Sequence, residues 1–467
     1  MPTTFNARVF REYDIRGQAD RDLPDSLVHD LGRALGTHLA RHGARRIAVG
    51  RDCRLSSPRL HAALRAGLAQ TPLAIVDIGV VPTPVLYFAP FGFDLHGGIM
   101  ITGSHNPPED NGFKIMRGRS TIHGAEIQRL RELIEQEDFT GGTGVAEERD
   151  AITPYLEHAR SCVALGPRRP RVVVDAGNGM GGLTAGPLYR SLGFEVTELH
   201  CEPDGRFPNH HPDPTQPENV AELVHKVRET GAEVGIAFDG DADRIGVVDA
   251  KGRIIWGDQL MILFARAILA EQPGATFVGE VKCSQALYDE IEKAGGRAVM
   301  WKVGHSLIKT RMKELGAVLA GEMSGHIFFA HRYLGFDDAV YAGARLLELL
   351  SHERRTLSDL VDTLPVMVNT PEIRADVPDD LKFEIVRRVT ERLRAHGDVN
   401  DIDGARVRLA GGWGLVRASN TQPALVLRFE AETQARLDEI RALVEHELAA
   451  ARDELGAAAV SSEFADL

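Results

Sequence analysis

Residues 234–244 read VGIAFDGDADR, an apolar run that ends in a loop with three aspartates. The same pattern of a short apolar strand and a polar or Gly-rich loop occurs in GGIMITGSHNP (97–107) and AVLAGEMSGH (317–326). Two further strand-and-loop stretches precede each of these three. They are IAVGRDCRLS and AIVDIGVVPTP (from residues 47 and 74), VVVDAGNGMGG and FEVTELHCEPDG (from 172 and 194), and TFVGEVKCSQ and AVMWKVGHS (from 276 and 298).

The recurrence predicts the fold class. Amphipathic stretches such as 221–230 lie between the apolar strands, and strands that alternate with helices indicate βαβ units and a mainly parallel sheet. We therefore expect three tandem, similar α/β domains with mainly parallel, mixed sheets. From residue 370 the pattern changes to short strands and long amphipathic helices, typical of an α+β domain. The predicted domains span 1–150, 151–255, 256–369 and 370–467.

The predicted topology also locates the functional site. In open parallel sheets ligands bind beyond the carboxyl ends of the strands, which is where all of these loops would lie. We expect a central cleft to which each α/β domain contributes loops.

Composition excludes several classes of protein. The formal charge of −13 argues against a nucleic acid or an anionic membrane as the main partner. No stretch approaches the roughly 18 apolar residues that a membrane span needs, and the chain opens without the apolar region of a secretory signal. The four cysteines form no CxxC pair, which favours reduced thiols. We expect a cytoplasmic protein that binds small molecules.

The aspartates of DGDADR are the strongest metal-binding candidates. Asp239, Asp241 and Asp243 follow a predicted buried strand at i, i+2 and i+4 spacing, so their oxygens can converge on one hard cation. Oxygen ligands suit Mg²⁺ or Ca²⁺ better than zinc. A solvated acidic turn is the alternative.

The loop TGSHNP (102–107) presents Ser104 at the end of a strand, a suitable place for a nucleophile or a phosphoacceptor. The GxSxG pattern of serine hydrolases is absent, because Asn106 occupies the place of the second glycine. We do not expect His105 to face the Ser104 hydroxyl, since adjacent side chains of an extended segment point to opposite sides. A helix-capping turn is the alternative.

Two later loops carry hydrogen-bonding groups. GEMSGH (321–326) offers Glu322, Ser324 and His326, which could bind sugar hydroxyls. RASNTQP (417–423) combines a fixed cation with polar side chains and could hold a phosphate. Basic residues in other loops could complete the cleft: Arg16, Arg51, Arg54, Lys114, Arg244, Lys302 and His305.

Together these motifs resemble the α-D-phosphohexomutase family, in its phosphomannomutase/phosphoglucomutase branch. The resemblance rests on FREYDIRG, GRDCR, TGSHNP, NGFK, DGDADR, KVGHS, GEMSGH and RASNTQP, which occur in the family's order over essentially the whole chain. It implies an isomerase that interconverts the 1- and 6-phosphates of mannose or glucose, through a phosphoserine and a hexose 1,6-bisphosphate. It also implies Mg²⁺ as cofactor, sugar phosphates as ligands, and a monomer.

The resemblance assigns roles by position. Ser104 would be the phosphoserine, and Asp239, Asp241 and Asp243 would bind Mg²⁺ together with an oxygen of the serine phosphate. The transferring phosphoryl group would be lined by Arg16, His105, Lys114 and Arg244. Glu322 and Ser324 would bind the 3- and 4-hydroxyls of the sugar. The other phosphate would be held by Arg417, Ser419, Asn420 and Thr421, with Lys302 and His305, while Tyr13 and His326 would be cleft residues without a defined role.

The chain departs from the family pattern at two positions. Gly103 replaces the alanine of many relatives, and Ala242 replaces a glycine. Neither change removes a ligand. Since alanine resists a positive φ, we expect Ala242 to avoid one.

Other functions remain to be weighed. GNGMGG (177–182) fits a dinucleotide-binding pattern, with Glu202 about 20 residues further on, although a turn that packs a helix onto its sheet explains the glycines more simply. Asp239 could be the nucleophile of a haloacid-dehalogenase-type phosphatase, but Asp243 stands where that signature has Thr or Val. A phosphoglucosamine mutase and a non-catalytic sugar-phosphate binder are further alternatives. Met323 favours the phosphomannomutase/phosphoglucomutase branch by resemblance.

Overall fold

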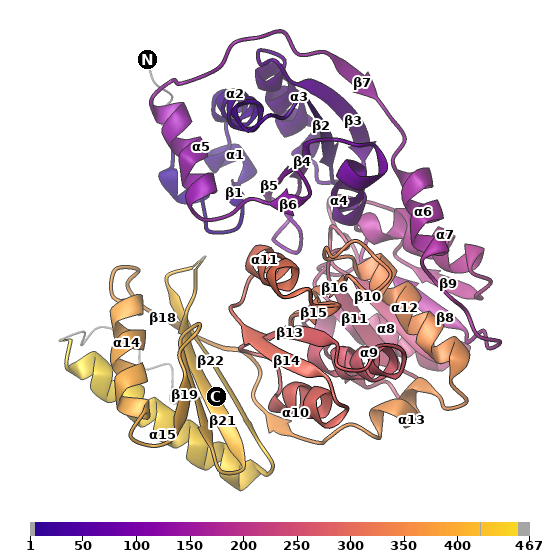
Figure 1. The fold of residues 1–467 in the computed structure, drawn as a ribbon, viewed down its shortest axis with the longest axis vertical. Coiled ribbons are helices and arrows are strands. Elements are labelled where there is room, and N and C mark those ends of the chain that lie inside the picture. Colours follow the sequence, from indigo (N-terminus) through magenta and orange to yellow (C-terminus); the bar gives the residue numbers. More distant parts are fainter. Residues whose placement is uncertain (1–4, 421, 456–467) are drawn as a thin grey trace.

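The computed structural model describes residues 5–420 and 422–455. Four sheets follow one another along the chain. Figure 1 shows the first at the top and the last at the lower left, with the second and third packed together on the right. The predicted fold class is confirmed, since three similar α/β units precede a C-terminal unit of a different kind.

The first sheet has the strand order β1-β5-β4-β2-β3-β7, with β6 pairing β5. Strand β7 extends the edge of this sheet, parallel to β3. The elements of this unit are η1 (Ala7–Val9), β1 (Ile15–Gln18), α1 (Ala19–Asp22), α2 (Asp25–Arg41), β2 (Arg46–Arg51), α3 (Ser57–Leu68), β3 (Ala74–Val80), α4 (Thr83–Gly92), β4 (Gly97–Ile101), β5 (Asp110–Arg117), β6 (Ser120–Thr121), α5 (Ala125–Glu135) and β7 (Ala146–Glu148).

The second sheet has the order β12-β11-β10-β8-β9. Its helix α8 illustrates how local sequence sets an element: Leu223 and Val227, four residues apart, turn one face to the core, and Gly231 ends the helix at φ +62°. The elements are α6 (Ile152–Ser161), β8 (Val172–Asp175), η2 (Met180–Leu183), α7 (Ala185–Ser191), β9 (Val196–Leu199), η3 (Pro217–Val220), α8 (Ala221–Thr230), β10 (Val234–Phe238), β11 (Ile245–Asp249) and β12 (Ile254–Ile255).

The third sheet has the order β14-β13-β15-β16. Its elements are α9 (Gly257–Glu271), β13 (Thr276–Glu280), α10 (Gln285–Lys293), β14 (Arg297–Trp301), α11 (His305–Leu315), β15 (Leu319–Gly321), β16 (Ile327–Phe329), α12 (Ala339–His352) and α13 (Leu357–Val361).

The three sheets repeat one arrangement. In each, the third strand of the triplet lies beside the first, the first beside the second, and all three are parallel. An antiparallel strand then pairs with the third: β5 with β4, β11 with β10, and β16 with β15. The loops 102–109, 239–244 and 322–326 therefore occupy equivalent positions in the three units.

The second and third units share one hydrophobic core. Helix α12 packs against β10, β11 and α7 of the second unit as well as against β16 of its own. Its Leu346 and Leu347 belong to the same buried cluster as Val172 and Ile236. The Tyr189 hydroxyl, from α7, also donates a hydrogen bond to the Val340 carbonyl at 3.0 Å.

The C-terminal unit has an antiparallel sheet with the order β17-β22-β21-β20-β19, while β18 also pairs β22. Its elements are β17 (Val368–Asn369), β18 (Ile373–Asp376), α14 (Lys382–Leu393), β19 (Asp398–Asn400), β20 (Ala405–Leu409), β21 (Gly412–Ala418), β22 (Ala424–Ala431) and α15 (Gln434–Asp453). Trp413 packs on Val281 of the third unit, and the Lys282 ammonium lies 3.0 Å from the Glu372 carboxylate. Within the described ranges, no helix is both long and apolar enough to cross a membrane.

Candidate active site

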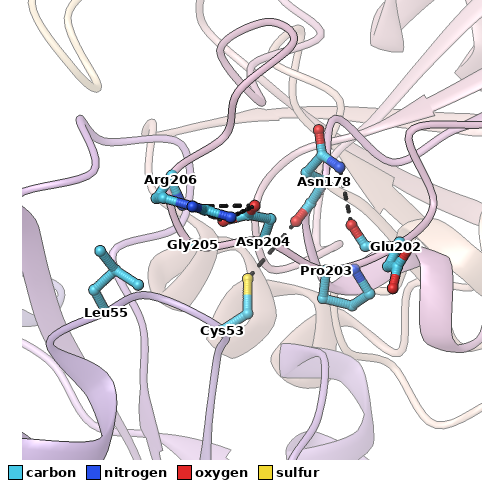
Figure 2. A pocket seen from close by; sticks show the side chains of 8 residues that line it. All are labelled: Cys53, Leu55, Asn178, Glu202, Pro203, Asp204, Gly205 and Arg206. Atoms are coloured by element: carbon cyan, nitrogen blue, oxygen red, sulfur yellow. Dashed lines mark hydrogen bonds and ion pairs between the residues drawn. The ribbon is translucent and has the colours of Figure 1, made fainter.

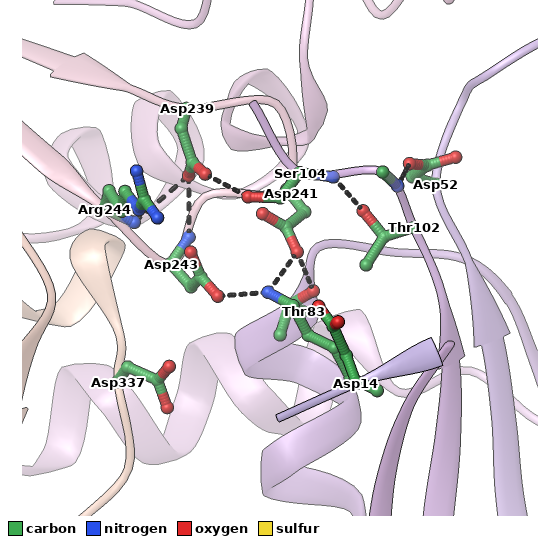
Figure 3. A network of polar contacts seen from close by, with 12 residues as sticks. Asp14, Asp52, Thr83, Thr102, Ser104, Asp239, Asp241, Asp243, Arg244 and Asp337 are labelled. Carbon is green, nitrogen blue, oxygen red and sulfur yellow. Dashed lines mark hydrogen bonds and ion pairs between the residues drawn. The ribbon is translucent and has the colours of Figure 1, made fainter. Parts of the chain in front are cut away.

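The three equivalent loops meet at one point. The Ser104 hydroxyl donates a hydrogen bond of 2.6 Å to Asp239 Oδ2, which joins the first unit to the second (Figure 3). Asp243 Oδ1 lies 3.1 Å from His326 Nε2, and His326 Nδ1 lies 2.6 Å from Glu322 Oε2, which joins the second unit to the third. A hydroxyl, a trio of acids and the GEMSGH loop are therefore connected by direct contacts.

The backbone of the serine loop is not extended. Ser104 has φ +50°, and its amide donates to Thr102 Oγ1 at 2.9 Å. This left-handed turn brings His105 Nδ1 to 3.1 Å from Ser104 Oγ. Our expectation that His105 faces away from the serine hydroxyl is therefore wrong, because it assumed a strand conformation that the loop does not adopt.

The metal-loop carboxylates are fully buried and lie close enough to share one ion. One oxygen from each of Asp239, Asp241 and Asp243 lies within 4.8 Å of the others, and all three side chains have 0% exposure. Asp241 Oδ1 is buried without a hydrogen-bond partner. A buried orphan oxygen beside two further carboxylates fits a hard divalent cation.

Ala242, in the middle of this loop, has φ +63°. Our expectation that alanine would avoid a positive φ is wrong at this position. Its amide donates to the Asp239 carbonyl at 3.1 Å, and its carbonyl accepts a bond of 3.3 Å from the amide of Ala339 at the start of α12. The left-handed conformation costs about 1–2 kcal/mol for a residue with a Cβ, and the surrounding hydrogen bonds and packing hold it in place.

Lys114 neutralises part of the acidic cluster. Its ammonium lies 2.7 Å from Asp241 Oδ2 and also contacts Asp243 Oδ2. Burial alone would lower the pKa of Lys114, but Asp241 and Asp243 outweigh burial and raise it. Thr83, at the start of α4, donates a further bond of 2.5 Å to Asp241 Oδ2.

The carboxyl groups of the cluster differ in proton affinity. Burial and the charges of Asp243 and Asp241 raise the pKa of Asp239 well above its usual range. Burial would raise the pKa of Asp243 as well, but Lys114 and His326 lower it. Asp239 therefore resists ionisation, and a bound cation would remove that penalty.

The GEMSGH loop forms a second polar centre. Glu322 Oε1 accepts a bond of 2.7 Å from the Gly304 amide, and Oε2 lies 3.5 Å from the Ser324 hydroxyl. Burial would raise the pKa of Glu322, but the hydrogen bond and charge of His326 lower it to about 2. Burial would lower the pKa of His326, yet Asp243 and Glu322 raise it to about 9.

The predicted phosphate loop lies between two units. The Arg417 guanidinium pairs with the Asp403 carboxylate at 3.1 Å, and Asp403 Oδ2 also accepts a bond from the Val303 amide at 3.0 Å. Asn420 Nδ2 donates to the Tyr13 hydroxyl at 2.7 Å, while that hydroxyl donates to the Val303 carbonyl at 2.9 Å. Tyr13 therefore links the first, third and fourth units.

Other predicted residues are placed as follows. Ser419 accepts a bond from the Gln422 amide at 3.1 Å, whereas Thr421 lies outside the described residues. Arg16 donates to Asn106 Oδ1 at 2.8 Å and pairs with Asp14. Arg244 contacts His326 Nε2 at 3.2 Å. His305 Nδ1 lies 3.5 Å from Asp337 Oδ2, and Lys302 is exposed.

The pKa of the His105 imidazole lies well below its usual range. Burial is the largest cause of this shift, and the positive charges of Arg244 and Arg16 add to it. His105 is therefore neutral beside Ser104 Oγ.

Sequence reasoning missed several residues of this network. Thr83, Asp337 and Asp403 each contact a predicted site residue. Thr83 belongs to VPTP, the loop after the second strand of the first triplet. KVGHS is the equivalent loop of the third triplet and carries predicted site residues, so the equivalence of the two loops could have identified Thr83. Asp337 and Asp403 lie in irregular segments without a motif, and only the tertiary structure brings them to the site.

The Gly-rich loop 177–182 does not have the structure of a dinucleotide site. It leads into the short turn η2, and a Cβ on Gly182 would lie 1.8 Å from the Cys201 carbonyl oxygen, so the glycines allow close packing. Asn178 of this loop, with Cys53, Leu55 and residues 202–206, lines a hollow of about 460 Å³. Figure 2 shows the lining side chains. The lining includes Glu202 and Asp204, whose carboxylates would repel a pyrophosphate, and Arg206 pairs with Asp204.

Comparison with known families gives matches over most of the chain. Models of phosphoglucomutase/phosphomannomutase α/β/α domains I, II and III match residues 7–141, 153–252 and 256–367. The model of the phosphoglucomutase/phosphomannomutase C-terminal domain matches residues 372–447.

Individual relatives agree with the family models. The chain is 46% identical to phosphomannomutase/phosphoglucomutase of Pseudomonas aeruginosa over 448 residues, 96% of each protein. It is 46% identical to phosphoglucomutase of Neisseria gonorrhoeae over 439 residues, 93% of this chain and 95% of the relative.

Solved structures resemble the chain over its whole length. A phosphoglucomutase/phosphomannomutase family protein of Burkholderia thailandensis aligns with a TM-score of 0.90 at 42% identity, covering 96% of this chain and 98% of that one. An N-acetylphosphoglucosamine mutase of Aspergillus fumigatus, solved in complex with glucose 1,6-bisphosphate, aligns with a TM-score of 0.61 over 96% of each chain. At 14% identity, it shows a common fold alone.

Proposed function

The chain belongs to the phosphoglucomutase/phosphomannomutase family, and from this premise we propose that it interconverts the 1- and 6-phosphates of mannose and glucose through a phosphorylated Ser104. The observation that carries the proposal is the 2.6 Å contact between Ser104 Oγ and Asp239 Oδ2, inside a cluster of three buried aspartates. The dehydrogenase and phosphatase alternatives have no support from the family.

Asp239, Asp241, Asp243 and a phosphate oxygen on Ser104 are the proposed ligands of Mg²⁺. The buried, unpartnered Asp241 Oδ1 and the all-oxygen donor set support this assignment. When bound, Mg²⁺ would supply positive charge to offset the charge on the phosphoryl oxygens.

The neighbouring basic groups divide into charge partners and a proton carrier. Lys114, whose ammonium faces two carboxylates, serves as a fixed cation, because its raised pKa makes it a poor base. Arg16 and Arg244 add charge near the serine loop. His105 is neutral and has Nδ1 3.1 Å from Ser104 Oγ, so it is the proposed proton acceptor.

The far end of the sugar phosphate is assigned to the third and fourth units. Glu322 and Ser324 bind the 3- and 4-hydroxyls, since a carboxylate accepts and a hydroxyl both donates and accepts hydrogen bonds. The non-transferring phosphate is assigned to Arg417, Ser419, Asn420 and Thr421, assisted by Lys302 and His305. Tyr13 contacts Asn420 and His326 lies between Asp243 and Glu322, and both stay cleft residues without a defined role. To bind that phosphate, Arg417 exchanges part of its contact with Asp403 for the ligand.

The proposed cycle has two phosphoryl transfers. The bond between Ser104 Oγ and phosphorus breaks while the free sugar hydroxyl forms a bond to phosphorus. The proton of that hydroxyl passes through the base to the released Ser104 Oγ. The resulting hexose 1,6-bisphosphate turns round in the cleft. Its other phosphoryl group returns to Ser104 Oγ, and the serine proton passes through the base to the released sugar oxygen. Such transfers depend on positioning and charge neutralisation more than on covalent chemistry.

The remaining assignments complete the proposal. The 3- and 4-hydroxyls have the same configuration in glucose and mannose, so dual specificity follows from the Glu322 loop, and a phosphoglucosamine mutase is the alternative. We place the protein in the cytoplasm as a monomer that binds sugar phosphates and no nucleic acid. The domain boundaries we propose are 1–150, 151–255, 256–369 and 370–467.

The test compares the protein with Ser104→Ala. Isotope label should exchange between the 1- and 6-phosphates of mannose and glucose with the parent protein, given Mg²⁺ and a trace of hexose 1,6-bisphosphate. The variant should retain its melting temperature but show no exchange. Full exchange by Ser104→Ala would disprove the role of the serine, and faster turnover of glucosamine phosphate than of either hexose phosphate would favour the alternative.

A further inference from the structure

The Arg54 side chain is buried against the serine loop. It follows β2 in the motif GRDCR and is 1% exposed. We had expected its cation to line the cleft, but the guanidinium is turned toward main-chain carbonyl oxygens. Nη2 donates to Ser104 O at 2.7 Å and to Asn106 O at 2.6 Å, while Nη1 donates to Asp110 O at 2.9 Å and to Pro107 O.

These bonds converge on one short segment. Four carbonyl oxygens of residues 104–110 face one planar group, which offers its donors in a fixed geometry. Arg54 Nε also lies 3.4 Å from Asp52 Oδ2, and the same oxygen accepts a bond of 3.2 Å from the Gly103 amide. A Cβ on Gly103 would lie 2.5 Å from Arg54 Cζ, so loop and guanidinium are in close contact.

The loop needs such support because its conformation is unfavourable by itself. Ser104 has φ +50°, a region that residues with a Cβ seldom occupy. Without Arg54 the carbonyl oxygens of Ser104 and Asn106 would lose this donor, whereas the Pro107 carbonyl would keep the Asp110 amide at 3.0 Å. The conformation that Arg54 stabilises is the one that brings Ser104 Oγ to 2.6 Å from Asp239 Oδ2.

The second unit closes over the same segment. His211 Nε2 donates a hydrogen bond of 2.5 Å to the His105 carbonyl, and the Phe207 ring centre lies 5.2 Å from Arg54 Cζ. Phe207 and His211 belong to the long loop between β9 and η3. The serine loop is therefore held by donors from two different units.

We propose that Arg54, together with His211, is a positioning residue that sets the distance between Ser104 and the aspartate cluster without touching the sugar phosphate. The proposal rests on the mutase function proposed above. Since a displacement of about 1 Å can lower a rate roughly 100-fold, loss of these donors should act on kcat. Substrate affinity should change little, because the sugar and the distant phosphate are assigned to other loops.

The test measures kcat and KM of two variants and one control. Arg54→Lys keeps the charge but cannot reach four carbonyl oxygens, so we expect kcat to fall about 10- to 100-fold while KM stays within about twofold. His211→Phe removes only the donor from the second unit, and we expect a fall in kcat of about three- to tenfold. Neither loss should be restored by more Mg²⁺ or bisphosphate.

Arg168→Lys is the matched control. Arg168 also clamps carbonyl oxygens, those of Leu350, Glu353 and Arg355, but in a region outside the active-site network. This variant should lose thermal stability and keep the parent kcat. The comparison separates positioning of Ser104 from a general loss of stability.

The outcomes are distinct. Values of kcat within twofold of the parent in folded Arg54→Lys and His211→Phe would overturn the proposal, as would a large rise in KM at unchanged kcat, which would make Arg54 a substrate-binding residue. If Arg54→Lys does not fold, His211→Phe decides by the same criteria. Absence of phosphate exchange in the parent protein would instead contradict the proposed function.

Discussion

Lys114→Met should lower the stability of the metal-free protein and increase its affinity for Mg²⁺. The Lys114 ammonium contacts Asp241 and Asp243, all three groups being at most 4% exposed. Breaking a buried ion pair by removing one partner costs about 3–5 kcal/mol, because the other charge stays buried without compensation. At roughly 2–4 °C per kcal/mol for a cooperative unit of about 150–250 residues, the melting temperature in EDTA of the joined second and third units should fall by about 6–20 °C.

Added Mg²⁺ should reverse much of this loss. In the parent protein a cation has to compete with Lys114 for two carboxylates, whereas in the variant it meets all three without a competitor. The Mg²⁺-induced rise in melting temperature should therefore be larger in the variant, since a ligand stabilises the folded state in proportion to its occupancy. Phosphoryl transfer should nevertheless fall, because the fixed cation of the aspartate cluster is lost.

Differential scanning fluorimetry with EDTA and with a Mg²⁺ series measures both effects. Lys282→Met is the matched control, because Lys282 is also buried and pairs with a carboxylate, Glu372 Oε2 at 3.0 Å, and neither residue belongs to the acidic groups around Asp243. This control should lose stability without gaining a larger Mg²⁺ response. An equal Mg²⁺ shift in the parent and in Lys114→Met would refute the reasoning.

Three further predictions concern the fourth unit, the metal loop and a cysteine. Lys282 lowers the pKa of Glu372 from 4.5 to about 2, so the stabilisation of this contact, at most about 3 kcal/mol, is complete above pH 4.5 and is lost as the pH falls toward 2. Trp413 fluorescence should follow that loss, and Glu372→Gln should abolish its pH dependence. Ala242→Gly should change the free energy of unfolding in urea by less than about 1 kcal/mol. The glycine relieves backbone strain, but it also loses the packing of the methyl group and raises the entropy of the unfolded chain, so these effects nearly cancel. A loss of stability above about 2 kcal/mol would contradict the strain argument. Burial raises the pKa of the half-buried Cys53 thiol to about 12. Alkylation by iodoacetamide at pH 8, followed by mass spectrometry, should therefore be on the order of 10³ slower than for a free thiol and should rise about tenfold per pH unit. A rate near that of free cysteine would contradict the raised thiol pKa.

The sequence predicted the repeated architecture because the information is local and occurs three times. Each apolar strand is followed by its own loop, and the common strand order then brings the loops after β4, β10 and β15 to equivalent places. The helix expected at 221–230 is observed with the same limits, since its apolar spacing and Gly231 define both its face and its end.

Features that depend on contacts between distant segments could not be predicted from the sequence. The positive φ of Ala242 contradicts its intrinsic preference, and it is imposed by hydrogen bonds to Asp239 and Ala339. The direction of the Arg54 side chain is set by carbonyl groups that lie about 50 residues further along the chain. Nothing in the local sequence distinguishes a cation that binds a phosphate from one that binds a backbone.

The packing of α12 across two sheets limits how the protein can be shortened. A fragment that ended after β12 would keep the three aspartates of the DGDADR loop, yet it would expose the apolar surface of β10 and α7 that α12 covers. Such a fragment should aggregate when expressed alone. A minimal metal-binding piece therefore has to extend through His352, so engineers who exchange modules between relatives should transfer residues 151–352 together.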